Sequence, residues 1–222
     1  MDYVAPDFAS AALVTIDAQV DTLDGGPLEI PGTSAAVPRI APLAASFRAA
    51  GKPITHMVRL YCRDGSNVDL CRRSVVEAGA ELLAPGSAGS QLAPGILNEP
   101  EGFTLDPDTL LAGRPQDVWA GEVVIYKPRW GAFYDTPLED HLRRQGVSTI
   151  VFCGCNFPNC PRTSIYEASE RDFRVVLAED AVSGLYERGS TELQSIGVSL
   201  MLTSEIIESL GRTVQAGAFR VT

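Results

Sequence analysis

Three cysteines in one short stretch are the residues of this sequence best suited to chemistry. Cys153, Cys155 and Cys160 lie within eight residues, in the order C-x-C-x4-C, and they follow the apolar run 150–152. Such a stretch fits three kinds of site: a metal held by thiolates, a disulfide, or one nucleophile at the start of a helix. The residues around the cysteines distinguish among these.

The cysteine count disfavours a disulfide framework. The chain has five cysteines, an odd number, and its N-terminal residues show neither the basic start nor the long apolar stretch of a secretion signal. Thiols in such a chain are expected to be reduced, as they are in a cytoplasm. The sequence therefore predicts a cytoplasmic protein.

A metal site fits the cysteine spacing poorly. Structural zinc sites mostly use paired C-x2-C knuckles, and this stretch has none. A fourth ligand would have to come from Cys62 or His56, and His141 is the only other histidine for a catalytic metal. The turn after the first strand has no GxGxxG pattern for a dinucleotide. We expect no metal and no cofactor, with a structural zinc protein as an alternative.

The position of Cys160 favours a nucleophile. Pro161 follows it, and proline is favoured at the first position of a helix, which places Cys160 at the helix cap. The free N–H groups and the dipole at a helix start favour a thiolate, so we expect a lowered thiol pKa there. Cys153 and Cys155 lie on an apolar strand and fit buried core positions.

The elements that must position these residues alternate between strands and helices. Short β-branched runs predict strands at 11–17, 53–60, 122–127, 148–154 and 174–180, with a final short strand at 203–206. Helices are predicted at 39–50, 136–145, 162–172 and 187–202. This order predicts one α/β domain over residues 1–222, with a doubly wound parallel sheet.

One segment interrupts this alternation. Residues 84–116 hold five prolines and five glycines, and loops of this length usually serve as lids or binding elements. We expect a lid or a contact between subunits.

The ends of the predicted strands carry a chemically useful set. Ligands of open parallel sheets bind beyond the carboxyl ends of the strands. Asp17, Lys127 and the turn leading to Cys160 stand at three of these ends. Alone, an aspartate there often forms a turn and a lysine is often solvated. Together they provide an acid, a cation and a thiol.

Charge limits the class of partner. The net charge is −10, and no basic stripe is present to displace the counterions of a nucleic acid. No apolar run is long enough to cross a bilayer. We therefore expect a small-molecule partner, with no nucleic acid and no membrane. The arginines gather locally, at positions 59, 63, 72 and 73.

Three separated motifs resemble the isochorismatase-like cysteine hydrolases. They are LVTIDAQ (13–19), GEVVIYKPRWGAF (121–133) and STIVFCGCNFPNCPRTSIYEASERDFRVVLAEDAVSG (148–184), and the resemblance runs from about residue 13 to 207. It implies a single-domain, three-layer Rossmann-like fold with a six-stranded, mostly parallel sheet and helices on both faces. It also implies a homo-oligomer that hydrolyses small amides, ureides or lactams through a thioester, with a triad of Asp17, Lys127 and Cys160.

The resemblance implies more about the stretch around Cys160. A cis peptide between Cys155 and Asn156 would direct the Asn156 N–H and the Cys160 N–H toward one oxyanion. Many members have threonine where this chain has Asn156, a change that affects the pocket wall. Relatives that cleave vinyl ethers lack the cysteine, and nicotinamidase-like relatives bind a metal through several histidines, where this chain offers His56 alone. A non-catalytic interaction module with the same fold is the alternative function.

Aromatic and polar residues in the loops after the strands are predicted to bind the substrate. Aromatic walls bury ligand area, and a few polar groups set its orientation. Phe133 also fits packing at the sheet edge. The predicted pocket residues are Gln19, Leu23, Arg59, Tyr61, Trp130, Phe133, Tyr134 and Phe157.

Overall fold

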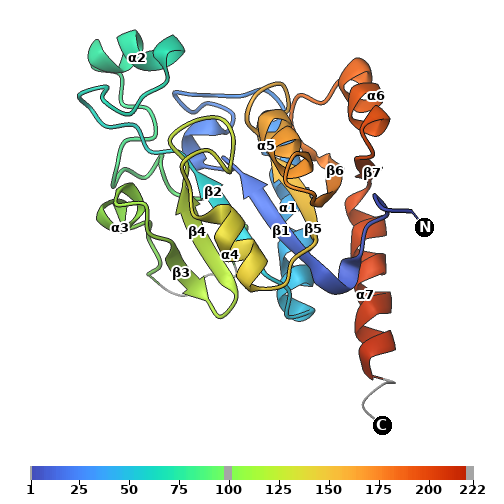
Figure 1. Cartoon of the computed structure of the whole chain (residues 1–222). Coiled ribbons are helices and arrows are strands. Elements are labelled where there is room, and N and C mark those ends of the chain that lie inside the picture. The colour runs from blue at the N-terminus through green and yellow to red at the C-terminus, as the bar shows by residue number, and fades with distance from the viewer. Residues whose placement is uncertain (1, 98–101, 219–222) are drawn as a thin grey trace.

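A seven-stranded sheet is the centre of the computed structural model, which describes residues 2–97 and 102–218 (Figure 1). The strand order is β3-β4-β2-β1-β5-β6-β7, and every neighbouring pair is parallel except β3 and β4. The strands are β1 (Ala11–Ile16), β2 (Ile54–Val58), β3 (Gln116–Trp119), β4 (Glu122–Tyr126), β5 (Thr149–Gly154), β6 (Arg174–Val182) and β7 (Ser199–Met201). The predicted α/β class is confirmed.

Helices cover both faces of the sheet. In Figure 1, α4 and α5 lie in front of the sheet and α1 lies behind it, where it packs against β6 and α7. The helices are α1 (Thr33–Ala49), α2 (Leu70–Glu77), α3 (Pro107–Leu111), α4 (Leu138–Arg144), α5 (Cys160–Ser169), α6 (Glu187–Ser195) and α7 (Thr203–Ala218). None of the helices within the described ranges is both long and apolar enough to span a membrane.

Strand β1 shows how the apolar sequence builds two cores. Successive side chains of a strand point to opposite faces. Leu13 packs with Phe47 of α1, whereas Val14 and Ile16 pack with Ile165 of α5. All of these side chains are fully buried, and burial of such a side chain stabilises the fold by about 1.5–3 kcal/mol. The central strand is apolar on both faces because both faces are covered.

The C-terminal part of the chain differs from the prediction. The single helix expected over 187–202 is wrong, because α6 ends at Ser195 and β7 follows. Gly197 there adopts a positive φ of 84°, a conformation that ends a helix. The strand expected at 203–206 is also wrong, because α7 begins at Thr203. The Asp180 carboxylate accepts hydrogen bonds from Thr203 N and Oγ1, both at 2.8 Å, and caps this helix from β6.

The sheet has seven strands and not the six expected, because β3 and β7 were both missed and the strand expected at 203–206 is helical. The side chains of β3 alternate between half-buried and exposed, so its sequence lacks the apolar run of the inner strands. Helix α1 begins six residues earlier than predicted and continues through Pro38 and Pro42. Each proline removes one helical hydrogen bond. The buried face formed by Ile40 and Phe47 holds the helix together.

The described part of the 84–116 segment packs on the body of the protein. Leu92 forms an antiparallel bridge with Gln19, and Val20 N donates to Gln91 O at 2.9 Å. Leu92 joins a small core with Leu60 and Leu105. The role of this segment as a lid or subunit contact stays a prediction.

A buried ion-pair network joins β2, β4 and α1. Arg48 Nε and Nη2 donate to the two Glu122 carboxylate oxygens at 2.6 and 2.7 Å. His56 Nε2 donates to Glu122 at 2.8 Å, and its Nδ1 accepts from Thr15 Oγ1 at 2.8 Å. Burial lowers the pKa of His56, so the ring is neutral. Burial opposes the Glu122 charge, but the hydrogen bonds from Arg48 and His56 outweigh it and lower the pKa of Glu122 to about 2.

The substitution Glu122→Gln should lower the free energy of unfolding at pH 7 by about 2–4 kcal/mol, because it leaves a part-buried Arg48 without its carboxylate. The folded-state pKa of Glu122 is depressed, so the wild type has this stabilisation above about pH 4.3 and loses it as the pH falls toward 2. Urea unfolding across pH 2–7 measures the difference. Glu208→Gln, at an exposed pair on α7, should change stability by less than about 0.5 kcal/mol. Equal effects of the two variants would contradict the prediction.

Candidate active site

Three elements bring Asp17, Lys127 and Cys160 together at the carboxyl edge of the sheet. Asp17 directly follows β1, Lys127 directly follows β4, and Cys160 is the first residue of α5. Lys127 Nζ lies 2.8 Å from Asp17 Oδ2, and these side chains are 0% and 7% exposed. Asp17 and Cys160 line the same pocket. The order β4-β2-β1-β5 therefore gathers three strand ends into one site.

The Asp17 carboxylate has one oxygen available for chemistry. Oδ2 is paired with Lys127, whereas the buried Oδ1 has no hydrogen-bond partner among the described residues. Buried carboxylate oxygens are normally hydrogen-bonded. Asp17 also has a positive φ of 48°, which turns the chain away from the strand and is tolerated by aspartate. The free oxygen lies at the pocket that holds Cys160.

The Cys160 thiol differs from the prediction. Burial raises its pKa to about 12, and the Asp17 carboxylate raises it further, against the partial offset of Lys127. The expected lowering by the helix start is therefore wrong, because it is smaller than the cost of an anion in a buried position beside a carboxylate. The thiol is protonated at neutral pH and has a carboxylate beside it.

Among the described residues, two backbone N–H groups at the start of α5 and in the turn before it have no acceptor. The Cys155–Asn156 peptide is cis, as the resemblance implied. Cys155 N donates to Ile16 O and Phe157 N donates to Ser183 O, each at 2.8 Å. Within the part of the chain that the structure describes, the N–H groups of Asn156 and Cys160 have no such partner. Both residues line the pocket, so these donors are available to a ligand oxygen.

The pocket contains three of the predicted substrate-binding residues. Arg59, Tyr61 and Trp130 line it together with Asp17 and Cys160. Its volume is about 30 Å³, which suits a very small group. Further lining residues were not found from the sequence: Thr22, Leu28, Ile30, Arg72, Leu83, Cys155 and Asn159. The local cluster of arginines was the only sequence feature that pointed to Arg72. No sequence feature pointed to the apolar lining residues Leu28, Ile30 and Leu83.

The other five predicted residues do not line this pocket. Phe157 is fully buried and packs edge-on against Tyr186, with ring centroids 5.4 Å apart. Phe133 packs against Phe173 at 5.9 Å, which is the sheet-edge packing considered as its alternative. Tyr134 is exposed at the surface. For these three aromatic residues, a position in a loop after a strand was therefore not enough to predict that the ring lines the pocket.

Gln19 and Leu23 serve the loops around the pocket. The Gln19 amide donates to Arg59 O at 2.9 Å and to Ser90 O at 2.6 Å, and its oxygen accepts from Arg59 N at 2.8 Å. Leu23 packs on the α1 side of the sheet. Gln19 therefore joins the loops after β1 and β2 and fixes the backbone of Arg59.

The comparisons with known proteins identify the family and the fold. A family model described as the isochorismatase domain matches residues 11–195. The chain belongs to the isochorismatase family. A crystal structure of an isochorismatase family protein from Desulfovibrio vulgaris shares the fold, with a TM-score of 0.76 and 30% identity, over 91% of this chain and 98% of that one.

Two curated relatives of this isochorismatase-family chain differ in their described activity. The ureidoacrylate amidohydrolase RutB of Methylobacterium radiotolerans is 30% identical over 79% of this chain and 68% of its own. A probable inactive nicotinamidase of Arabidopsis thaliana is 26% identical over 93% of this chain and all of its own. The relatives support amide hydrolysis as the general chemistry, and they include a protein described as inactive.

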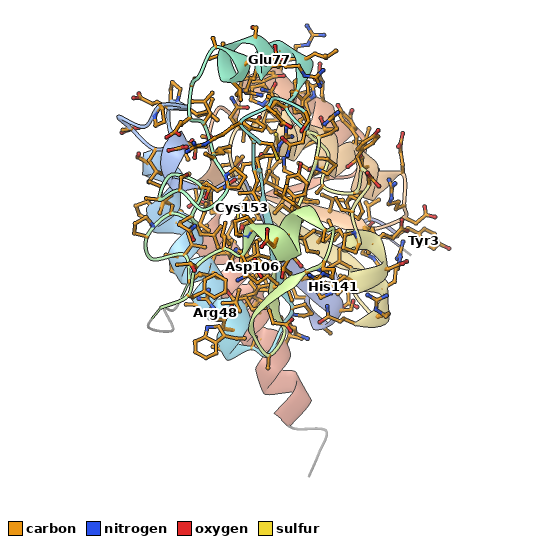
Figure 2. All side chains as sticks on the ribbon, turned by 90° about the vertical axis from the view of Figure 1, so that its left-hand side faces the viewer. Tyr3, Arg48, Glu77, Asp106, His141 and Cys153 are labelled. Carbon is orange, nitrogen blue, oxygen red and sulfur yellow. The ribbon has the colours of Figure 1, made fainter. Side chains whose placement is uncertain are left out.

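The three neighbouring thiols have separate surroundings in this family member. Cys153, labelled in Figure 2, is buried in the core on the α1 side. Cys160 packs on the α5 side, and the Cys155 thiol donates to Asp17 O at 3.1 Å. Within the described ranges, no group of three or more histidine, cysteine or acidic residues is arranged to hold a metal. The two nitrogens of His56 are already hydrogen-bonded.

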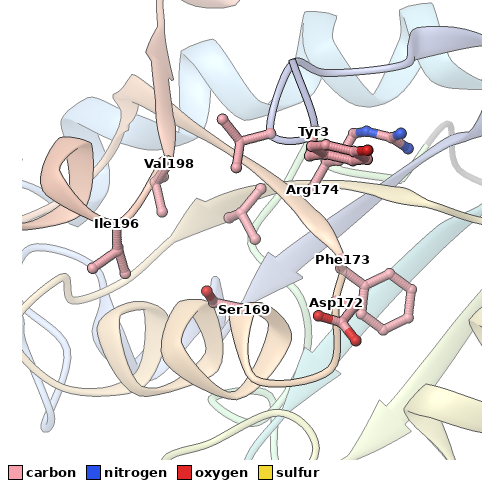
Figure 3. Close-up of a pocket in the computed structure, with 10 residues that line it drawn as sticks. Tyr3, Ser169, Asp172, Phe173, Arg174, Ile196 and Val198 are labelled. Atoms are coloured by element: carbon pink, nitrogen blue, oxygen red, sulfur yellow. The ribbon is translucent and has the colours of Figure 1, made fainter. Parts of the chain in front are cut away.

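A larger hollow of about 480 Å³ lies at the opposite edge of the sheet (Figure 3). It is bordered by Ser169 at the end of α5, Arg174 at the start of β6, and Val198 just before β7. The described residues that line it include no cysteine, histidine or lysine. The small pocket at the carboxyl edge is therefore the better candidate for chemistry.

Asp17→Asn should make Cys160 label faster with iodoacetamide, because the substitution removes the negative charge that raises the thiol pKa. A lower thiol pKa increases the thiolate fraction at pH 8 and partly reduces the nucleophilicity of the thiolate, so the rate should rise roughly threefold to tenfold. Peptide mapping separates Cys160 from the other four thiols, and Asp24→Asn in the adjacent exposed loop is the control. Labelling that is unchanged or slower in Asp17→Asn would contradict the role of the Asp17 charge in raising the thiol pKa.

Proposed function

We propose that this protein is a cysteine amidohydrolase that cleaves the C–N bond of a small amide, ureide or lactam through a thioester. One observation carries the proposal: a thiol, a carboxylate–ammonium pair and two backbone donors that have no acceptor among the described residues meet at one pocket. This set provides a nucleophile, a proton acceptor and an oxyanion site. The amidohydrolase among the relatives supports the same chemistry.

In the first step, the Cys160 sulfur attacks the amide carbon as Asp17 takes the thiol proton. Because burial raises the pKa of the thiol, the base must be in the pocket, and Asp17 Oδ1 is the free oxygen there. The C=O electron pair moves to oxygen, which the Asn156 and Cys160 N–H groups stabilise. One such donor is typically worth about 3–4 kcal/mol in the transition state. Lys127 stabilises the negative charge on the Cys160 sulfur and on the oxygen of the tetrahedral intermediate.

In the second step, the oxyanion of the tetrahedral intermediate reforms the C=O double bond, and the C–N bond breaks. Asp17 gives its proton to the leaving nitrogen, and a thioester to Cys160 remains. Asp17 then takes a proton from water, which attacks the thioester carbon. The C–S bond breaks and Cys160 is protonated again. Each of these steps uses groups of this chain.

A non-catalytic interaction module is the second candidate function. The similarity to a probable inactive relative covers 93% of this chain, and the pocket of about 30 Å³ admits only a small group as it stands. The intact thiol, carboxylate and ammonium set favours the enzyme.

A panel of amides, ureides and lactams should contain substrates that release nitrogen, and Cys160→Ser should abolish this release. The hydroxyl is a much weaker nucleophile in a site built around a thiol. An acyl adduct of Cys160, detected by mass spectrometry after rapid acid quench, is the expected thioester. Cys71→Ser, at an exposed thiol, is the matched control and should keep its rate. Full activity of Cys160→Ser would contradict the mechanism, and an inactive wild type across the panel would favour the interaction module.

We further propose a cytoplasmic homo-oligomer, with segment 84–116 and α7 as candidate contact surfaces. In Figure 1, the C-terminal part of α7 extends beyond the rest of the ribbon, where a partner could cover it. Light scattering at micromolar concentration should give at least twice the chain mass of 23.7 kDa. A monomer at that concentration would contradict the proposal.

A further inference from the structure

The Arg59 guanidinium is a buried cation with unused donors at the pocket. Its side chain is 3% exposed, and Nη2 donates to Asp69 and lies 3.4 Å from Tyr61 Oη. Nε and Nη1 are buried and have no acceptor among the described residues. A buried guanidinium N–H without an acceptor is costly, so a ligand is the simplest explanation for it. Gln19 holds the Arg59 backbone at both N and O, which fixes its position.

The charges around the pocket do not balance. Arg59 and Arg72 share the carboxylate of Asp69. Asp69 accepts a hydrogen bond from Arg59 Nη2, and its Oδ2 lies 3.6 Å from Arg72 Nη1. Tyr61 Oη donates to Asp69 at 3.0 Å, and burial raises the pKa of this phenol, so Tyr61 remains neutral.

The catalytic pair adds no net charge, because Lys127 is matched by Asp17. Among the ion pairs of Arg59, Arg72 and Lys127 in the described residues, three cations therefore share two carboxylates. Both Arg59 and Arg72 lie close enough to Cys160 to interact with it electrostatically. Their positive charge is thus within reach of the reacting carbon of a small substrate.

We propose that the substrate is a small amide that also carries one carboxylate, which Arg59 and Arg72 bind while the amide carbon lies at Cys160. This inference rests on the proposed amidohydrolase function. The carboxylate accepts the free Arg59 donors and provides a third anion for the three cations. Apolar walls from Leu28, Leu83 and Trp130 keep water from this pair and strengthen it. Hydrolysis converts the amide and water to a second carboxylate and ammonia, and repulsion from Asp17 then favours product release.

Substrate pairs of similar size that differ in charge test the proposal. Oxamate, malonamate and succinamate each have a neutral twin of similar size in oxamide, malonamide and succinamide. For the best chain length, kcat/KM for the amide acid should exceed that for its twin by about 10- to 150-fold, the effect of hydrogen bonds to a charged group. Arg59→Gln should reduce this ratio to near one, mainly through KM, and Arg59→Lys should restore part of it. Arg63→Gln, at an exposed pair outside the pocket, should leave the ratio unchanged.

A second measurement does not depend on hydrolysis. Iodoacetate and iodoacetamide have the same leaving group and similar size but differ in charge. The ratio of their rates with Cys160, divided by the same ratio for glutathione, should be at least about tenfold in favour of iodoacetate, as expected for a charged hydrogen bond. Arg72→Gln, at a partly exposed side chain, should lower the ratio without unfolding the protein, and thermal melting checks the fold of each variant.

The outcomes separate this inference from the proposed function. Hydrolysis that depends on Cys160 but is as fast for the neutral twins, with no preference for iodoacetate, overturns the carboxylate site alone. A preference for iodoacetate that Arg59→Gln removes, without hydrolysis of any amide, supports the carboxylate site and overturns the amidohydrolase. Preference for amide acids and for iodoacetate, both lost in Arg59→Gln, supports both.

Discussion

The buried ion pair between Lys127 and Asp17 is the interaction on which the rest of the site depends. An ammonium without solvent exposure is stable only with a close anion, since the desolvation of a lone ion costs several kcal/mol. The pair forms because β4 and β1 end at the same edge, with β2 between them. The positive φ of Asp17 turns its carboxylate over that edge.

Burial and this pair together set the protonation state of the nucleophile. Lys127 favours a thiolate, but burial and, after it, the Asp17 carboxylate outweigh this effect, and the Cys160 thiol keeps its proton. A neutral thiol beside a carboxylate with one free oxygen is suited to proton transfer during attack. The neutral thiol adds no anion to the pocket, so Arg59 and Arg72 share the carboxylate of Asp69 and can still bind a negatively charged substrate group.

Close packing of the backbone holds the turn before α5 against β1. Gly154, at the end of β5, has a φ of 116°, and a Cβ there would lie 2.1 Å from Ile16 O. Only glycine permits this approach, which lets Cys155 N donate to Ile16 O directly before Asp17. The loop after β2 is attached in the same region through Gln19. The site is thus formed by segments far apart in the sequence that hydrogen bonds fix around the end of β1.

The sequence alone determined five of the seven strands, the α/β class and the strand-end positions of Asp17, Lys127 and Cys160, because apolar runs and turn residues are local properties. It could not show that α7 replaces the strand expected at its start, since the cap comes from Asp180 on β6. It also missed the raised thiol pKa, which depends on burial among distant segments. The pocket walls and the unmatched charge of Arg59 were decided by tertiary structure, because desolvation and pairing exist only after folding brings the loops together.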